Sequence, residues 1–232
     1  MARYVQMASA DTDPIPRVDG VVFDVDGTLV DSNDAHALAW VEVLAEHGYR
    51  ATFAEVRPLV GMGGDKVLPI LTKLSEESEA GRAIGERRAE IFRRRHLPTI
   101  RPFPKVRELV DCLQRDGLRV AVASSASEDD LRALLERASV ADLLDRAASK
   151  DDAPRSKPDP DVVRAALARL GVPAHRVLMV GDTPYDVEAS LRAGVVPIAL
   201  RCGGYWTDAD LRRAVAILDD PAALLAHFDG ER

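Results

Sequence analysis

The sequence has little of several features that mark other classes of protein. It contains 2 cysteines among 232 residues, Cys112 and Cys202, and they form no Cys-x-x-Cys pair. Neither a disulfide framework nor a cysteine-rich metal site is therefore expected, and reduced thiols favour a cytoplasmic protein. No apolar run approaches the roughly 18 residues of a membrane-spanning helix, so we expect no membrane partner.

An excess of basic residues is also missing. Lys and Arg number 31 against 38 Asp and Glu, which gives a net charge of −7. A protein that binds nucleic acid normally carries a basic excess or a basic face, so we expect no nucleic-acid partner. With 47% hydrophobic and 30% charged residues, the composition is that of a globular protein. Nothing in the sequence sets the oligomeric state.

Residues 1–17 lack the apolar core of a signal peptide. They carry two acids and two prolines, Asp11, Asp13, Pro14 and Pro16. We expect this stretch to be a flexible tail rather than a targeting signal, which agrees with a cytoplasmic location.

Short apolar runs alternate with helical patterns along much of the chain. The runs are continuously apolar, which is typical of strands buried on both faces of a parallel sheet. Several helical patterns stop at a glycine, as helices commonly do. We predict an α/β fold with a doubly wound parallel sheet. The expected strands are 21–23, 118–123, 177–180, 196–200 and 214–218, and the expected helices are 104–116, 128–137, 160–170, 186–193 and 221–228.

One stretch interrupts this alternation, because residues 34–100 show helical patterns and no convincing strand. Asn33 and Thr52 can each cap a helix there, and the loop Gly61–Gly64 precedes a further helix. We therefore predict an all-helical domain at 34–100, inserted into a core made of 18–33 and 101–232. The prolines around 98–104 stiffen the second connection between the two parts.

Polar residues follow three of the predicted strands. Asp24, Ser124 and Asp182 each stand directly after an apolar run. In an open parallel sheet, ligands bind in the crevice beyond the carboxyl ends of the strands. Turns also favour Asp and Ser, but that preference explains one such position better than three.

The segment Asp24-Val25-Asp26-Gly27-Thr28 adds chemical detail. Two carboxylates so close together repel each other unless a cation lies between them, and Mg²⁺ prefers oxygen ligands. Asp182 would supply a third oxygen and Lys157 a fixed positive charge. A metal, a lysine and a serine hydroxyl around one point are suited to binding a phosphate.

These residues resemble the motifs of the haloacid dehalogenase superfamily. Asp24–Thr28 is similar to its first motif, Ser124 to the second, Lys157 before Pro158 to the third, and Gly181–Asp186 to the fourth. The order matches from residue 18 to about residue 220, and the helical insertion resembles the first type of cap domain in this superfamily. Within this superfamily, the sequence resembles the phosphoglycolate phosphatases and the β-phosphoglucomutases.

The resemblance implies a Mg²⁺-dependent phosphatase that acts on a small phosphorylated metabolite through an aspartyl phosphate. Asp24 would be the nucleophile and Asp26 the general acid and base. The metal ligands would be the carboxylates of Asp24 and Asp182 and the main-chain carbonyl of Asp26.

The same resemblance implies a phosphate site and a supporting residue. Ser124, Ser125, Lys157 and Gly27 would bind the phosphate. Asp186 would orient Lys157 or a water molecule on the metal.

Two residues of the insertion are candidates for substrate specificity. His36 follows Asp24 by 12 positions, a spacing that resembles a cap histidine of sugar-phosphate enzymes, although it also suits an ordinary amphipathic helix. Lys66 follows a glycine-rich loop that resembles the family's specificity loop, or it is a solvated lysine in a plain connection. One arginine among Arg87, Arg88 and Arg93–Arg95 could also face the cleft and meet a second anionic group.

Three other functions remain to be weighed. A phosphomutase would use the same acids, but β-phosphoglucomutases carry an acidic residue where this chain has Gly181. A dehalogenase needs neither the second acid nor Mg²⁺. A scaffold protein has no use for paired acids beside a lysine. The sequence therefore favours the phosphatase and does not name its substrate.

Overall fold

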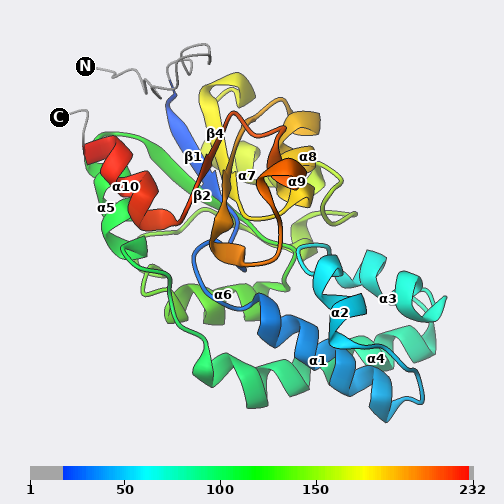
Figure 1. Ribbon diagram of the computed structural model, residues 1–232. Helices are drawn as coiled ribbons and strands as arrows, with labels where there is room; N and C mark the ends of the chain where they lie inside the picture. The colour runs from blue at the N-terminus through cyan, green and yellow to red at the C-terminus, as the bar shows by residue number, and fades with distance from the viewer. Residues whose placement is uncertain (1–17, 230–232) are drawn as a thin grey trace.

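The central element is a parallel sheet of six strands in the order β3-β2-β1-β4-β5-β6. The structure, a computed structural model, describes residues 18–229 (Figure 1). The predicted tail at 1–17 lies outside the described residues. The strands are β1 (Gly20–Phe23), β2 (Arg119–Ala123), β3 (Ala147–Ala148), β4 (Val177–Gly181), β5 (Val196–Leu200) and β6 (Ala216–Leu218). The predicted α/β class and the five predicted strands are confirmed, and β3 is an additional strand.

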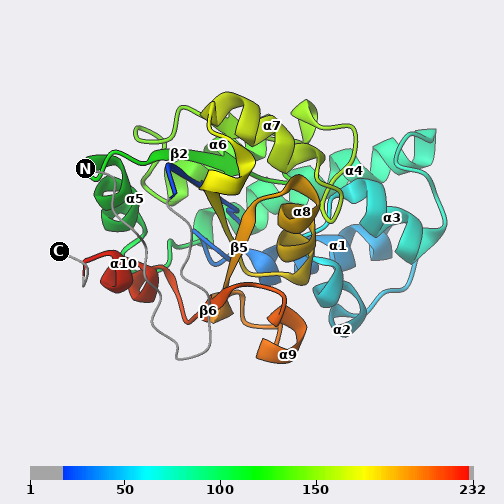
Figure 2. The same ribbon diagram turned by 90° about the horizontal axis from the view of Figure 1, so that it is seen from above.

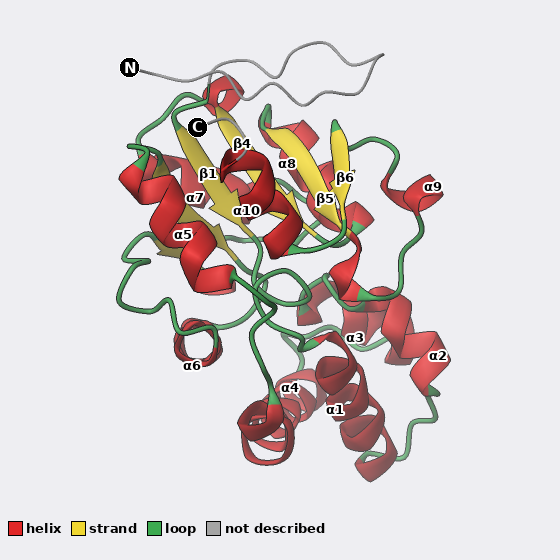
Figure 3. Cartoon of the chain, turned by 60° about the vertical axis from the view of Figure 1, so that its left-hand side comes forward, coloured by secondary structure: helices red, strands yellow, loops and turns green. Residues whose placement is uncertain are grey.

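Both faces of the sheet are buried under helices. Along β1, Val21 and Phe23 belong to one apolar cluster, whereas Val22 belongs to another, because successive side chains point to opposite faces. The first cluster is formed with α5 (Val106–Arg115), α6 (Glu128–Arg137) and α10 (Pro221–Asp229). The second is formed with α7 (Asp161–Leu170) and α8 (Pro184–Ala193). Figure 3 shows α5 and α10 in front of the sheet and α7 behind it. This doubly wound arrangement explains why the strands are continuously apolar.

The chain between β1 and α5 is helical. It contains α1 (Asn33–Glu46), α2 (Phe53–Val56), α3 (Gly64–Thr72) and α4 (Glu79–Ile91). A π-helical turn (Phe92–His96) and a 3-10 helical turn (Leu97–Thr99) follow α4 directly. We call residues 33–99 the helical segment. No strand is assigned to it in the described structure, and it lies on one side of the sheet, beyond the strand ends (Figures 1 and 2). The division into domains at 34 and 100 stays a prediction.

The two connections to the helical segment run side by side. The Asp31 amide donates to the Arg101 carbonyl at 2.9 Å, and the Phe103 amide donates to the Leu29 carbonyl at 3.0 Å. Val30 and Pro102 form an isolated antiparallel bridge between them. The helical segment is therefore joined to the rest of the chain by two connections that run next to each other. Among the described helices, none is long and apolar enough to cross a membrane.

The helix starts test the capping predictions. Thr52 accepts a hydrogen bond from the Glu55 amide and caps α2, as predicted, and Ser127 likewise caps α6. The prediction for Asn33 is wrong, because Asn33 is the first residue of α1 and its side chain makes no capping bond. Its side-chain Nδ2 instead donates a hydrogen bond to Asp182 Oδ2 at 2.8 Å.

Candidate active site

The polar residues that follow β1, β2 and β4 meet at one edge of the sheet. β1 pairs with both other strands, and Phe23 lies opposite Val122 on one side and Val180 on the other. Asp24, Ser124 and Asp182 therefore leave their strands at neighbouring points. All three are buried. This is the convergence that the sequence predicts.

Lys157 joins two of the carboxylates at this edge. Its Nζ lies 2.5 Å from Asp24 Oδ1 and 2.8 Å from Asp186 Oδ1. Asp186 also accepts hydrogen bonds at Oδ2 from the amide and hydroxyl of Thr183, at 3.1 and 2.6 Å, and so completes the capping box in which Thr183 is the N-cap of α8. Asp186 is thus paired with Lys157 by charge and with Thr183 by hydrogen bonds. The expected role of Asp186 in orienting Lys157 fits this geometry.

Asp182 is held from the helical segment. Asn33 Nδ2 donates to Asp182 Oδ2 at 2.8 Å, and the Thr28 hydroxyl lies 3.4 Å from Asp182 Oδ1 and 3.5 Å from Asp24 Oδ2. One hydroxyl has one hydrogen to donate. At least one of these two carboxylate oxygens therefore lacks a full hydrogen bond from Thr28.

Two glycines make room for this arrangement. Gly27 has φ +76°, and a Cβ atom there would lie 2.3 Å from Asp182 Oδ2. At Gly203 a Cβ would lie 1.8 Å from the same oxygen. The Gly27 amide donates to the Val30 carbonyl at 2.8 Å, so it is already paired, and phosphate binding by Gly27 stays a prediction.

The site carries more negative charge than its lysine balances. Burial raises the pKa of Asp24 to about 7, with the carboxylates of Asp186 and Asp26 adding to the effect and Lys157 opposing it. Burial, followed by the charges of Asp186 and Asp24, also raises the pKa of Asp182 well above its usual value. The pKa of Lys157 is raised because its two carboxylate partners outweigh the cost of its burial.

This charge fits a divalent cation. Asp24, Asp182 and Asp186 each offer an oxygen within 4.8 Å of the other two. Asp186 faces Lys157 and the start of α8, so Asp24 and Asp182 are the candidate metal carboxylates. Their hard oxygen donors suit Mg²⁺ or a similar ion.

Asp26 has a different environment. Its Oδ1 accepts from the Ser32 hydroxyl at 2.5 Å and from His36 Nε2 at 2.8 Å. Burial would raise the pKa of Asp26, but the charge interaction with His36 and the hydrogen bonds from His36 and Ser32 lower it below its usual value. The His36 ring stacks on Phe92 with centroids 4.1 Å apart. The structure thus brings the predicted residues Asp26 and His36 together.

The serines after β2 differ in accessibility. Ser124 is fully buried, and its hydroxyl oxygen accepts from the Ala126 amide at 3.1 Å, which leaves its own hydrogen free to donate. Ser125 is half-buried, and its hydroxyl lies 3.5 Å from the Gly61 carbonyl. Phosphate binding by either serine stays a prediction that this geometry permits.

A cavity of about 320 Å³ opens above the carboxylates. Its walls come from the sheet edge, from the glycine-rich loop and from α4. They include Asp24, Asp26, Ser125, His36, Gly61 and Arg88. The volume lies at the lower end of the range for small-molecule sites, so a small ligand is expected.

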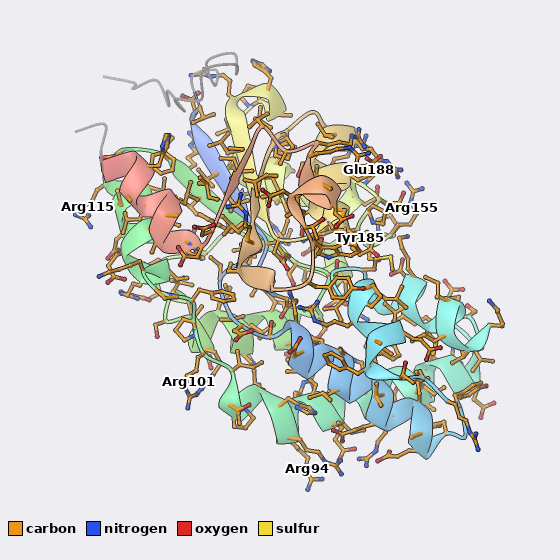
Figure 4. The ribbon with its side chains drawn as sticks, in the orientation of Figure 1. Arg94, Arg101, Arg115, Arg155, Tyr185 and Glu188 are labelled. Carbon is orange, nitrogen blue, oxygen red and sulfur yellow. The ribbon has the colours of Figure 1, made fainter. Side chains whose placement is uncertain are left out.

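Lys66 lies outside the lining of this cavity. Its Nζ forms an ion pair with Asp159 Oδ2 at 2.8 Å, so it links the helical segment to the sheet side of the molecule. Beside it, the Gly63 amide donates to the Ser156 hydroxyl at 2.9 Å. Tyr185, labelled in Figure 4, donates to the Pro58 carbonyl at 2.7 Å. The predicted contact between Lys66 and a substrate stays a prediction.

Sequence reasoning missed two residues that shape the site. Asn33 reads as a helix cap, and nothing in its neighbours points to Asp182, which lies 149 positions away. Gly203 stands in no motif, yet its carbonyl accepts from the Arg57 guanidinium and from Asn33 Nδ2 at 3.4 Å. The pair Gly203-Gly204 after a buried strand is the one available signal of a close approach.

Comparisons with known proteins identify the family of the chain. The sequence profile of the haloacid dehalogenase-like hydrolases matches residues 21–200. A phosphoglycolate phosphatase from Pseudomonas syringae pathovar tomato is 34% identical over 193 residues, which cover 79% of this chain and 69% of that protein.

Two solved structures are similar over most of the chain. A hydrolase from Pseudomonas syringae has a TM-score of 0.84 and 28% identity, and the match covers 92% of this chain and 98% of that one. A protein from Bacteroides vulgatus, named as a candidate β-phosphoglucomutase, has a TM-score of 0.81 with 21% identity, covering 92% and 90% of the two chains, and shows the fold alone. The chain belongs to the haloacid dehalogenase-like hydrolase family and is an enzyme of its phosphatase class.

Proposed function

We propose that the chain is a Mg²⁺-dependent phosphatase that hydrolyses a small phosphorylated metabolite through an aspartyl phosphate on Asp24. The support is one arrangement: Asp182 and Lys157 lie next to Asp24 at the sheet edge, and Asp24 and Asp26 both line the cavity. Phosphoryl transfer depends on positioning and on balancing charge, and this group of residues serves both needs.

Asp24 and Asp26 would divide the chemistry. The Asp24 carboxylate attacks phosphorus, and Asp26, which must be protonated at this step despite its lowered pKa, gives its proton to the oxygen that leaves. Asp26 then takes a proton from the water that hydrolyses the aspartyl phosphate, and both acids return to their starting states. His36 and Ser32 hold the Asp26 carboxylate from the helical segment and its connection, and so fix its direction.

Mg²⁺ fits the charge of the site. The carboxylates of Asp24 and Asp182 and the main-chain carbonyl of Asp26 would hold it. When bound, the ion offsets the negative charge of the phosphate and of the buried acids. Asn33 would keep Asp182 in place by the hydrogen bond to Oδ2.

Lys157 and the serines would bind the phosphate oxygens. Lys157 is fully buried and fixed by Asp24 and Asp186, so its charge is already placed before a substrate arrives. Ser124 can donate its hydroxyl hydrogen, and Ser125 lines the cavity. Residues 34–100 would act as a cap that opens and closes on the paired connections around Val30 and Pro102.

A phosphomutase is the alternative from the sequence. β-Phosphoglucomutases carry an acidic residue at the position of Gly181. In this structure a Cβ at Gly181 would lie 2.4 Å from Asp186 Cβ. A larger residue there would displace Asp186 and, with it, Lys157. This packing favours hydrolysis over transfer between sugar positions.

A Mg²⁺-dependent assay on purified protein tests the proposal. We expect phosphate release from a panel of small phosphate monoesters, loss of that activity in EDTA and its return with Mg²⁺. Asp24→Asn should fold and release no phosphate, while Asp142→Asn, at an exposed position that pairs with Arg107, should serve as the active control. Full activity in EDTA, or turnover of Asp24→Asn, would reject the mechanism.

A further inference from the structure

The arginines of α4 and the turn after it fall into two groups, because Arg82, Arg88 and Arg93 line the cavity and the other three do not. Arg87, Arg94 and Arg95 point outward and pair with Glu46, Glu90 and Glu42. Figure 4 shows Arg94 directed away from the molecule. Arg88 lies on the inner side of α4, its side chain is 17% exposed, and it lines the cavity.

Arg88 is held in place by aromatic rings and a histidine rather than by a close carboxylate. Its guanidinium lies 5.6 Å from the Trp40 ring centroid and 5.8 Å from that of Phe92. Its NH1 lies 3.2 Å from His36 Nδ1. If Nε2 donates to Asp26, Nδ1 can accept from Arg88. The side chain is therefore oriented before any ligand arrives.

The charge of Arg88 is incompletely balanced. The nearest carboxylate oxygen, on Asp130, is 3.7 Å away, and the other oxygen of Asp130 is taken by Arg93 at 2.5 Å. Burial lowers the pKa of Arg88 by more than the charges of Asp130, Asp26 and Glu76 raise it. Glu76, which also lines the cavity, pairs with Lys150 at 3.3 Å. A cation in a cavity wall remains available to a ligand.

We infer that Arg88 binds a second anionic group of the substrate, so that the substrate is a short phosphate monoester whose leaving group ends in a carboxylate or a phosphate. The inference rests on the proposed function, since Asp26 is taken to meet the leaving oxygen. A single imidazole ring, His36, separates Asp26 from Arg88. This spacing, with the cavity of about 320 Å³, limits the leaving group to a few carbon atoms. A planar guanidinium binds either kind of anion by paired hydrogen bonds.

Three two-carbon esters test this subsite. 2-Phosphoglycolate ends in a carboxylate, ethylene glycol bisphosphate ends in a phosphate, and 2-hydroxyethyl phosphate has the same length and a neutral end. Each is assayed with wild type, with Arg88→Met and with Arg94→Met as the matched control. Methionine keeps an apolar stem for packing on Trp40 and removes the charge. Binding to Mg²⁺-loaded Asp24→Asn, with and without Arg88→Met, is measured by calorimetry.

We expect wild type to prefer one or both anionic esters in kcat/KM. Arg88→Met should reduce that preference by roughly 10–100-fold, the usual loss when a charged hydrogen-bonding partner is removed. Arg94→Met should keep it. If Arg88→Met loses the preference for 2-phosphoglycolate, the second anion is a carboxylate. If it loses the preference for ethylene glycol bisphosphate, the second anion is a phosphate.

Other outcomes overturn the inference or the proposed function separately. If wild type shows no preference for an anionic end, or Arg88→Met slows all three esters equally, Arg88 does not bind a second anion, although the phosphatase proposal stands. If no ester is hydrolysed but calorimetry shows binding that depends on Arg88, the subsite stands and the proposed reaction fails. If neither turnover nor binding depends on Arg88, the subsite is rejected.

Discussion

Asn33 opens the helical segment and donates a hydrogen bond of 2.8 Å to Asp182, which follows the fourth strand of the sheet. The first residue of the helical segment thus contacts a proposed metal ligand of the core. Asn33 Nδ2 also lies 3.4 Å from the Gly203 carbonyl, so the amide is fixed from two sides. A displacement of the start of the helical segment would therefore change the support of Asp182.

Asn33→Ala should weaken Mg²⁺ binding. Partners that orient a metal ligand commonly contribute about 10–100-fold to affinity, so the Mg²⁺ concentration for half-maximal activity should rise by about that factor. The rate at saturating Mg²⁺ should fall much less. Leu38→Ala, at a half-exposed position of the same helix, is the control. A loss of rate that Mg²⁺ cannot restore would place Asn33 in the chemistry instead.

Asp26→Asn should slow turnover by about 10²–10⁴-fold, the usual contribution of a general acid and base. Its affinity for Mg²⁺ should change little, because only the main-chain carbonyl would bind the ion. Rapid quenching should show both formation and breakdown of the phosphoenzyme slowed. A variant that loses Mg²⁺ affinity yet keeps its full rate at saturating Mg²⁺ would contradict this division of roles.

The sheet and the site floor could be predicted from sequence for one physical reason. Parallel strands buried on both faces are continuously apolar, so the polar residue that ends each run is easy to find. Asp24, Ser124 and Asp182 were located in this way. Ala147–Ala148 was missed because two alanines make no recognisable apolar run.

The walls of the site could not be predicted in the same way. Arg87 and Arg88 are neighbours in sequence, and a helix with arginines on several sides gives no sign of which one faces inward. The same holds for Lys66, whose partner Asp159 is set by how the helical segment packs on the core. These contacts depend on tertiary arrangement, which local patterns do not specify.

The metal-free protein should lose stability as pH rises between about 4 and 7. The folded-state pKa of Asp24 is raised from 3.8 to about 7, and that of Asp182 is also raised, so the folded state holds protons that the unfolded state releases. The stability present at low pH is thus lost as pH rises through the folded pKa. Asp26, whose pKa is lowered, acts in the opposite sense and only in more acidic solution.

Mg²⁺ should reverse this loss, because it binds the ionised carboxylates. Thermal melts at pH 5.5, 6.5 and 7.5 should show a Tm gain from Mg²⁺ that grows with pH. Asp182→Asn should raise the metal-free Tm at pH 7.5 and abolish the gain. A gain that is equal at all three pH values would show that these acids are ionised throughout the range.

The ion pair between Lys66 and Asp159 joins the glycine-rich loop to the core, at 2.8 Å and with both side chains about one-fifth exposed. Pairs with such exposure contribute little to folding, so Lys66→Ala should change the free energy of unfolding by less than about 1 kcal/mol. Its effect should instead fall on KM, because the pair holds the loop that carries Gly63 over the cavity. We expect Lys66→Ala to raise KM for the true substrate more than for a generic aryl phosphate.

Asp159→Asn should raise KM by a similar factor, and the double variant should add little to either change, since each removes the same contact. If Lys66→Ala raises KM while Asp159→Asn does not, Lys66 binds the substrate directly, as the sequence suggests. If neither variant changes KM, the pair is an ordinary solvated contact and the loop is held by Ser156 and Gly63 alone.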